Sequence, residues 1–127
     1  MKLTIIGTGY VGLVTGTCFA EVGHHVICVD NNKDKVKLLQ AGGIPIYEPG
    51  LEEMVQKNVA AGRLRFTASI QDGVENSDVV FIAVPTPPQM DGAVDLSFIE
   101  GVAREIANAM TSYKIIVDKS TDRKSVV

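Results

Sequence analysis

Three glycines near the amino terminus, Gly7, Gly9 and Gly12, constrain this chain more than any other feature of its sequence. They form the pattern Gly-x-Gly-x-x-Gly, where a short β-prone segment ends and a helical pattern begins. In such a turn the first glycine permits the tight bend, the second lets a phosphate approach the backbone, and the third lets the helix pack closely on the sheet. Amides at the helix start would then face the phosphate, and the helix dipole would attract it. The pattern alone is also compatible with a glycine-rich turn that binds no ligand.

An acidic residue, Asp30, ends the next β-prone segment, eighteen positions after Gly12. A carboxylate at that place can accept hydrogen bonds from the adenosine ribose of a dinucleotide. It would also repel the 2′-phosphate of NADP, by about 4 kcal/mol per charge pair at close range for an effective dielectric near 20. Lys33 and Lys35 lie nearby and soften that repulsion. The two features together predict an NAD site, although Asp30 could also be a solvated turn residue or the N-cap of the next helix.

The remaining sequence alternates β-prone and helix-prone segments. The β-prone segments are residues 2–6, 25–30, 63–67, 78–84 and 114–119, and the helical ones are 11–22, 32–40, 51–61, 69–76 and 97–110. Such alternation predicts one doubly wound, Rossmann-type α/β domain, in which right-handed crossovers place helices on both faces of a parallel sheet. A ligand site is expected beyond the carboxyl ends of the strands, which fall at Gly7, Asp30, Val84 and Ser120.

Composition excludes several classes of partner. The net charge is −3 with no block of like charges, which argues against nucleic acid and anionic membranes. No segment approaches the 18 or more apolar residues of a membrane span. His24 and His25 lack acidic or cysteine partners at useful spacing, so no metal site is expected.

The two cysteines, Cys18 and Cys28, have neither metal-ligand nor redox-motif spacing, and a reducing cytoplasm is the expected setting. Cys18 shares a helical spacing with three valines, and Cys28 lies within a β-prone segment. Both are therefore expected to be small core residues and not nucleophiles. The predicted apolar face of the first helix is Val11, Val14, Cys18 and Val22.

Four ordered motifs carry a resemblance to a known family. They are residues 7–14 (Gly-Thr-Gly-Tyr-Val-Gly-Leu-Val), 47–51 (Tyr-Glu-Pro-Gly-Leu), 84–88 (Val-Pro-Thr-Pro-Pro) and 118–121 (Asp-Lys-Ser-Thr). Together they resemble the N-terminal, NAD-binding domain of the UDP-glucose 6-dehydrogenases, within the UDP-glucose/GDP-mannose dehydrogenase family. The resemblance covers residues 1 to about 121.

The resemblance implies roles for individual residues. The backbone at Tyr10 and Val11 would meet the pyrophosphate, Asp30 would hold the adenosine ribose, and Lys35 would assist as a charged donor. Thr86 and Thr121 would contact the nicotinamide half. Lys35 could instead be a solvated lysine on the surface of its helix. The spacing of Tyr47 and Glu48 assigns neither residue a role.

Enzymes of this family oxidise the 6-hydroxyl of a UDP-hexose twice, with two NAD molecules and a cysteine nucleophile from a later domain. The resemblance therefore implies a chain that binds NAD(H), contains no catalytic residue, and meets a UDP-sugar only in the full-length enzyme.

The last residues depart from the family pattern. Family members usually continue after residue 121 with a Val-Pro-Val-Gly-Thr-like stretch, whereas this chain reads Asp-Arg-Lys-Ser-Val-Val. We expect an NAD-binding domain over residues 1–121 and a non-family tail over 122–127, derived from a truncation or a vector. A domain without its neighbouring strand and partner domain would leave apolar surface uncovered, which predicts self-association into a homo-oligomer or lowered stability.

Two other classes of protein also have the glycine turn and the acidic residue after the second strand. One is a regulatory nucleotide-sensing module of the kind that gates ion channels. The other is a fragment of a different Rossmann oxidoreductase, such as a hydroxyacyl-CoA or ketopantoate reductase domain. Neither explains residues 84–88 or 119–121, and nucleotide titration separates the sensor from the enzymes.

Overall fold

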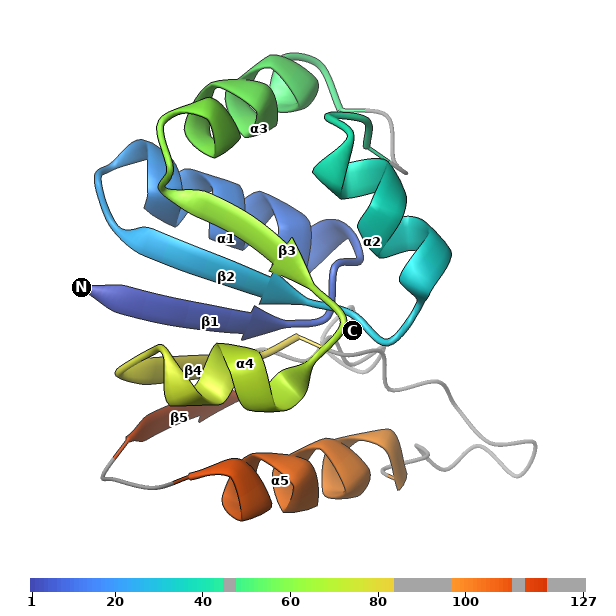
Figure 1. Cartoon of the computed structure of the whole chain (residues 1–127), viewed down its shortest axis with the longest axis vertical. Helices are drawn as coiled ribbons and strands as arrows, with labels where there is room; N and C mark the ends of the chain where they lie inside the picture. Colours follow the sequence, from blue (N-terminus) through green and yellow to red (C-terminus); the bar gives the residue numbers. More distant parts are fainter. Residues whose placement is uncertain (45–47, 84–96, 111–113, 119–127) are drawn as a thin grey trace, which may run out of the picture.

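The chain alternates strands and helices in the predicted order (Figure 1). The computed structural model describes residues 1–44, 48–83, 97–110 and 114–118. Its elements are β1 (Lys2–Ile6), α1 (Tyr10–Glu21), β2 (His25–Val29), α2 (Lys33–Gln40), α3 (Leu51–Ala60), β3 (Leu64–Thr67), α4 (Ile70–Glu75), β4 (Val79–Ile82), α5 (Ser97–Ala109) and β5 (Ile115–Asp118). Their ends differ from the predicted ends by at most two residues.

The described strands form one five-stranded sheet in the order β3-β2-β1-β4-β5, and every pairing is parallel. β1 lies at the centre, where it pairs with β2 on one side and β4 on the other. The strand order reverses at β1, so the carboxyl end of β1 borders the crevice in which doubly wound folds bind ligands. The doubly wound α/β prediction is confirmed.

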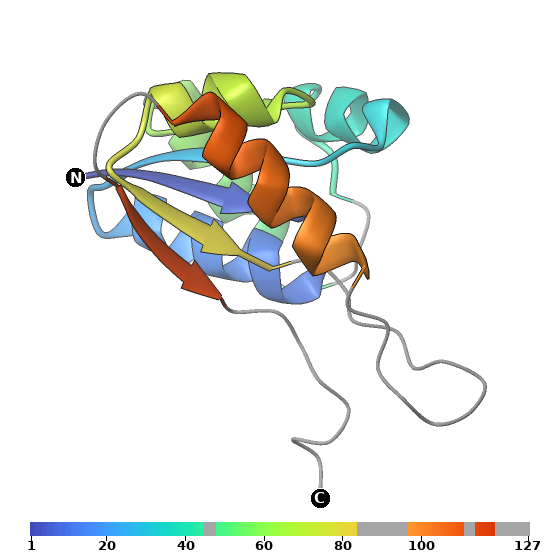
Figure 2. The same ribbon diagram turned by 90° about the horizontal axis from the view of Figure 1, so that it is seen from below.

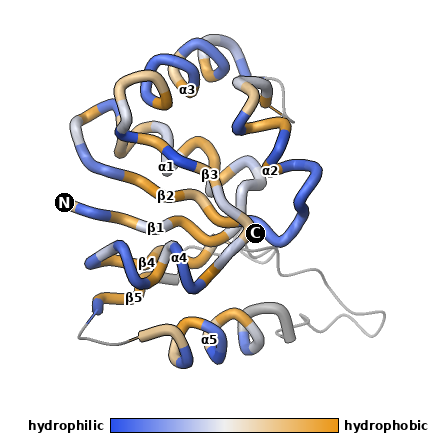
Figure 3. Tube along the Cα trace, viewed as in Figure 1, coloured by the Kyte–Doolittle hydropathy of each residue, from blue (hydrophilic) through white to orange (hydrophobic). Residues whose placement is uncertain are grey.

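Helices cover both faces of the sheet, and each face has its own apolar core. Because side chains alternate along a strand, consecutive residues of β1 and β2 supply the two cores. Figure 2 shows α1 on one side of the sheet and α5 on the other, and Figure 3 shows hydrophobic residues along the strands. The first core includes Leu3, Ile5, Leu13, Val26, Cys28, Leu39 and Val55. The second includes Ile6, Ile27, Val29, Val74, Val80, Ile82 and Ile106.

The face that α1 buries differs from the predicted one. Cys18 is exposed and Val22 is 73% exposed, so their assignment to the core was wrong. A Cβ atom at Gly16 would lie 2.8 Å from Sγ of Cys28 and 3.2 Å from Cγ1 of Ile5, so the helix approaches the sheet through a residue without a side chain. Apolar periodicity misjudged this face because glycines carry no hydrophobic signal. The buried residues of α1 are Gly12, Leu13, Gly16, Thr17 and Ala20.

Among the helices that the structure describes, none combines the length and the apolar character needed to cross a bilayer.

Candidate functional site

The glycine turn joins the end of β1 to the start of α1. Gly7 has a φ of 108°, a left-handed conformation that favours glycine, and its amide donates a 2.7 Å hydrogen bond to the carbonyl oxygen of Val29 at the end of β2. A Cβ atom built at Gly12 would lie 1.9 Å from the carbonyl oxygen of Gly7, whereas one built at Gly9 meets no atom within 4 Å. The first and third glycines thus serve the fold, and the second borders open space.

The start of α1 has neither a capping side chain nor an acidic residue in its own first turn. Its N-cap is Gly9, which makes no side-chain capping bond, and its first turn contains no acidic residue. The first intrahelical bond runs from the amide of Leu13 to the carbonyl oxygen of Gly9, at 2.9 Å. The three preceding amides, those of residues 10–12, therefore have no intrahelical acceptor one turn back. Such a helix end favours an anion through both its amides and its dipole.

Other helix starts in the described part of the chain are protected differently. In α2 the side chain of Asn32 accepts from the amide of Lys35, and in α4 the side chain of Ser69 accepts from the amide of Asp72. α3 begins after Gly50 and carries two glutamates in its first turn. The start of α1 is thus the one of these four that combines a bare N-cap with an absence of acidic residues.

The carboxylate of Asp30 lies beside this turn, directly after β2. Its Oδ2 atom accepts from the hydroxyl of Thr8 at 2.6 Å and from the amide of Thr8 at 3.0 Å. Its Oδ1 atom accepts from the amide of Asn32 at 2.9 Å. The amide of Asp30 donates to the carbonyl oxygen of Thr67 at the end of β3, at 3.1 Å. The residue therefore ties together the carboxyl ends of three neighbouring strands.

These contacts keep Asp30 ionised. Partial burial acts to raise its pKa, but the hydroxyl of Thr8 and the amides of Asn32 and Thr8 outweigh it and hold the pKa below the ordinary value. The ammonium group of Lys35, 3.6 Å from Oδ2, acts in the same direction. The site therefore places a fixed negative charge next to the electropositive start of α1.

The sequence matches a known family over nearly its whole length. The model of the UDP-glucose/GDP-mannose dehydrogenase family, NAD binding domain, matches residues 1–124. The chain belongs to this family.

Its relatives include UDP-glucose 6-dehydrogenases from two bacteria. The enzyme of Rhizobium meliloti (strain 1021) is 53% identical over 122 residues, which are 95% of this chain and 28% of that protein. The enzyme TuaD of Bacillus subtilis (strain 168) is 49% identical over 120 residues, 94% of this chain and 26% of that protein. This chain thus spans between a quarter and a third of the length of these relatives.

A solved dehydrogenase structure has the same fold. In a ternary complex of GDP-mannose dehydrogenase from Pseudomonas aeruginosa, the similar region covers 96% of this chain and 29% of that one, with a TM-score of 0.92 and 42% sequence identity. The matched unit is the NAD binding domain of the UDP-glucose/GDP-mannose dehydrogenase family, so NAD is confirmed as the cofactor class. Membership in this family decides against the nucleotide-sensing module and the other oxidoreductase fragments.

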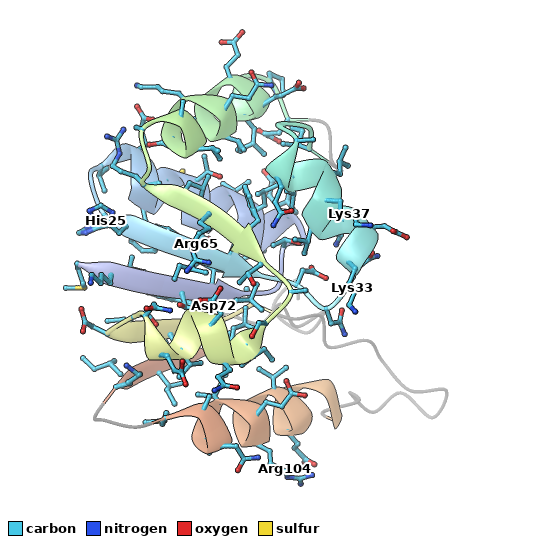
Figure 4. The ribbon with its side chains drawn as sticks, viewed as in Figure 1. His25, Lys33, Lys37, Arg65, Asp72 and Arg104 are labelled. Carbon is cyan, nitrogen blue, oxygen red and sulfur yellow. The ribbon has the colours of Figure 1, made fainter. Side chains whose placement is uncertain are left out.

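In this NAD-binding domain the structure brings together some of the predicted site residues. The three glycines of the turn, the first residues of α1, Asp30 and Lys35 meet at one edge of the sheet. Lys35 reaches Asp30 from within α2, whereas Lys33 and Lys37 project from the same helix into solvent (Figure 4). Asp30 and Lys35 are neighbours in the structure, with the Lys35 ammonium 3.6 Å from Oδ2, and their roles toward NAD stay predictions.

For most of the other predicted residues the structure gives no description. Thr86 and Thr121 fall outside the described residues, as do Tyr47 and the strand ends Val84 and Ser120. Glu48 is partly buried, and its carbonyl oxygen accepts from the amide of Leu51 at the start of α3.

Sequence reasoning missed Thr8, the residue that makes two hydrogen bonds to Asp30. The contact depends on the register of the strands, which the structure supplies and the sequence alone does not. β1 and β2 pair Ile6 with Val29, so the residues just beyond both strands are neighbours. A hydroxyl two positions after one strand can therefore reach a carboxylate one position after the other.

Proposed function

We propose that this chain binds NAD(H), with the pyrophosphate over Gly9 and the amides of Tyr10 and Val11, and with the adenosine ribose on Asp30. The observation that carries the proposal is the bare start of α1 beside a carboxylate held by hydrogen bonds. The open space next to Gly9 supports it, because a phosphate could approach the backbone there without meeting a side chain. The resemblance adds Lys35 at the ribose and Thr86 and Thr121 at the nicotinamide.

The residues of this chain would bind and orient the cofactor in distinct ways. The start of α1 attracts the diphosphate, and Gly7 and Gly12 fix that helix against the end of β1. Asp30 would accept a ribose hydroxyl group and repel a 2′-phosphate, which favours NAD over NADP. Once bound, the nicotinamide ring supplies the hydride acceptor of an alcohol oxidation.

For the whole protein we propose the activity named for the bacterial relatives, UDP-glucose 6-dehydrogenase. Its balanced reaction converts UDP-glucose, two NAD⁺ and water into UDP-glucuronate, two NADH and three protons. We place the catalytic cysteine outside this chain. Burial raises the pKa of Cys28 to about 12, so it is not a thiolate at neutral pH. Cys18 lies eight residues after the start of α1, about 12 Å along the helix axis.

We further propose a reducing cytoplasm as the compartment and self-association of the chain. Both cysteines are free thiols, which is typical of reducing compartments. Two isoleucines of β5, Ile115 and Ile116, are 51% and 46% exposed, and exposed apolar strand residues favour association. Residues 1–121 form the proposed NAD-binding unit, and residues 122–127 the proposed tail.

Isothermal titration calorimetry tests the cofactor proposal. We expect the chain to bind NADH more tightly than NADPH, and Asp30→Ala to lose about tenfold or more in NADH affinity, the loss typical of a charged hydrogen-bonding partner. The matched control is Asp72→Ala, which removes an aspartate of α4 that pairs with Arg65 of β3 (Figure 4). This control should bind NADH as the unmodified chain does. Equal affinity for both cofactors, or tighter binding of ATP, would contradict the proposal.

A further inference from the structure

We propose that Thr8 is a positioning residue that fixes which oxygen of Asp30 faces the ribose. The proposal rests on the proposed NAD site. Thr8 is 1% exposed, and its hydroxyl proton is committed to Oδ2 of Asp30 at 2.6 Å. The same oxygen accepts from the amide of Thr8. Thr8 therefore acts on the cofactor through Asp30, not by touching it.

The number of hydrogen bonds that a carboxylate can accept explains why the orientation of Asp30 matters for ribose binding. A carboxylate offers about four acceptor positions on its two oxygens. Three are filled by short hydrogen bonds from the chain itself, two on Oδ2 from Thr8 and one on Oδ1 from the amide of Asn32. The position left for a ribose hydroxyl is on Oδ1. Thr8 thus directs Oδ2 into the protein and leaves Oδ1 to the ligand.

The ion pair between Lys35 and Oδ2 holds the carboxylate less firmly than the two hydrogen bonds from Thr8 do. The ammonium group of Lys35 lies 3.6 Å away, beyond hydrogen-bond length, and its side chain is 28% exposed. The charged residues beside it in the first turn of α2, Lys33 and Asp34, are both exposed. Without the hydroxyl of Thr8, Oδ2 retains one amide donor, and the carboxylate can rotate away from the ribose. The ligand would then have to restore that orientation on binding, which lowers affinity.

The test compares two ligands that differ in the ribose hydroxyls, ADP and 2′,3′-dideoxy-ADP, alongside NADH. Thr8→Val removes the hydroxyl and keeps the backbone amide, whereas Thr8→Ser keeps both. We expect Thr8→Val to lose about five- to tenfold in affinity for NADH and ADP, the size of one charge-assisted hydrogen bond. Its affinity for 2′,3′-dideoxy-ADP should equal that of the unmodified chain. Thr8→Ser should bind all three ligands as the unmodified chain does.

A double-variant cycle separates this inference from the function on which it rests. In an Asp30→Ala background, Thr8→Val should cause no further loss of NADH affinity, because its effect passes through the carboxylate. If Asp30→Ala binds NADH normally, the proposed ribose site itself is wrong. If Asp30→Ala weakens binding but Thr8→Val does not, or weakens ADP and 2′,3′-dideoxy-ADP equally, the role of Thr8 is overturned while the NAD site stands.

A second pair of variants covers a failure of Thr8→Val to fold. Thr8→Ser and Thr8→Ala differ from each other only by the hydroxyl. Urea unfolding establishes that both are folded, and the same three ligands are then titrated. A five- to tenfold loss for ADP in the alanine variant alone, absent with 2′,3′-dideoxy-ADP, supports the inference. Equal ADP affinity in the two variants overturns it.

Discussion

The carbonyl oxygen of Gly7 occupies the place where a side chain at Gly12 would begin. The distance from that oxygen to a Cβ atom built at Gly12 is 1.9 Å, far below any real contact between these atom types. Both groups belong to the backbone, and the amide of Gly7 is itself bonded to the end of β2. Neither group can move without opening the turn, so α1 is joined to the sheet by a contact that tolerates no side chain.

Replacement of Gly12 should therefore destabilise the whole domain. We expect Gly12→Ala to lower the free energy of unfolding by about 3 kcal/mol or more, the upper range for overpacking, because the obstruction is backbone and not a flexible side chain. Urea unfolding followed by circular dichroism measures this loss. A change below about 0.5 kcal/mol would mean that the turn adapts easily and that the contact does not define it.

Replacement of Gly9 should affect the ligand and spare the fold. Its φ of −70° suits any residue, and a Cβ atom there meets no protein atom within 4 Å. We expect Gly9→Ala to change stability by less than about 1 kcal/mol. NADH affinity should fall by about tenfold or more, because the methyl group stands where the proposed phosphate approaches. Calorimetric titration measures the affinity, and Gly12→Ala is the matched comparison. Normal NADH binding by Gly9→Ala would move the diphosphate away from this turn.

A buried amide at the opposite edge of the sheet should matter for stability alone. Asn58 is fully buried; its Nδ2 atom donates to Glu21 and to the carbonyl oxygen of Met54, both at 2.8 Å, and its Oδ1 atom accepts from Arg63. Asn58→Ala leaves these groups without their partner, and we expect a loss of about 2–4 kcal/mol in urea unfolding with unchanged NADH affinity.

The control for Asn58 is the neighbouring Lys57. Its ammonium group lies 2.7 Å from Glu21, but its side chain is 63% exposed. Exposed ion pairs contribute less than about 1 kcal/mol, so Lys57→Ala should be nearly neutral. Equal losses in Asn58→Ala and Lys57→Ala would show that burial of the amide is not what stabilises this corner.

The fold and the outline of the site could be predicted from the sequence because their signals are local. Apolar segments such as residues 26–29 alternate with helical patterns, and this alternation alone predicts a parallel sheet. Gly7 and Asp30 each follow directly after a strand, and the carboxyl ends of parallel strands meet at one edge. Their proximity therefore followed from the predicted topology.

The features that the sequence did not predict depend on contacts between residues far apart in the chain, which no local pattern contains. The buried face of α1 is set by how closely Gly16 approaches Cys28, residues on different elements. The bond from Thr8 to Asp30 depends on the register between two strands, which the sequence does not state. A hydrophobic periodicity detects large apolar side chains, so it failed where small residues permit close packing.

Acid should destabilise the domain partly through Asp30. Its pKa is lowered in the folded chain, so the unfolded state binds more protons in the window below the ordinary value of 3.8. The stabilisation is thus present above that value and is lost as pH falls through the folded pKa. We expect the free energy of unfolding, measured in urea from pH 7 to pH 2.5, to fall less steeply below about pH 4 in Asp30→Ala than in the unmodified chain. Identical slopes would show that Asp30 titrates alike in both states.

The two cysteines should differ sharply in reactivity, although both are free thiols. Cys28 of β2 is fully buried and faces Gly16 of α1, and burial raises its pKa to about 12, so neither access nor ionisation favours its reaction. Cys18 is exposed on α1. Ellman's reagent at neutral pH should titrate one thiol per native chain and two in urea, and Cys18→Ser should abolish the native reaction. Two fast thiols in the native chain would indicate that β2 and α1 separate readily, contrary to the close contact at Gly16.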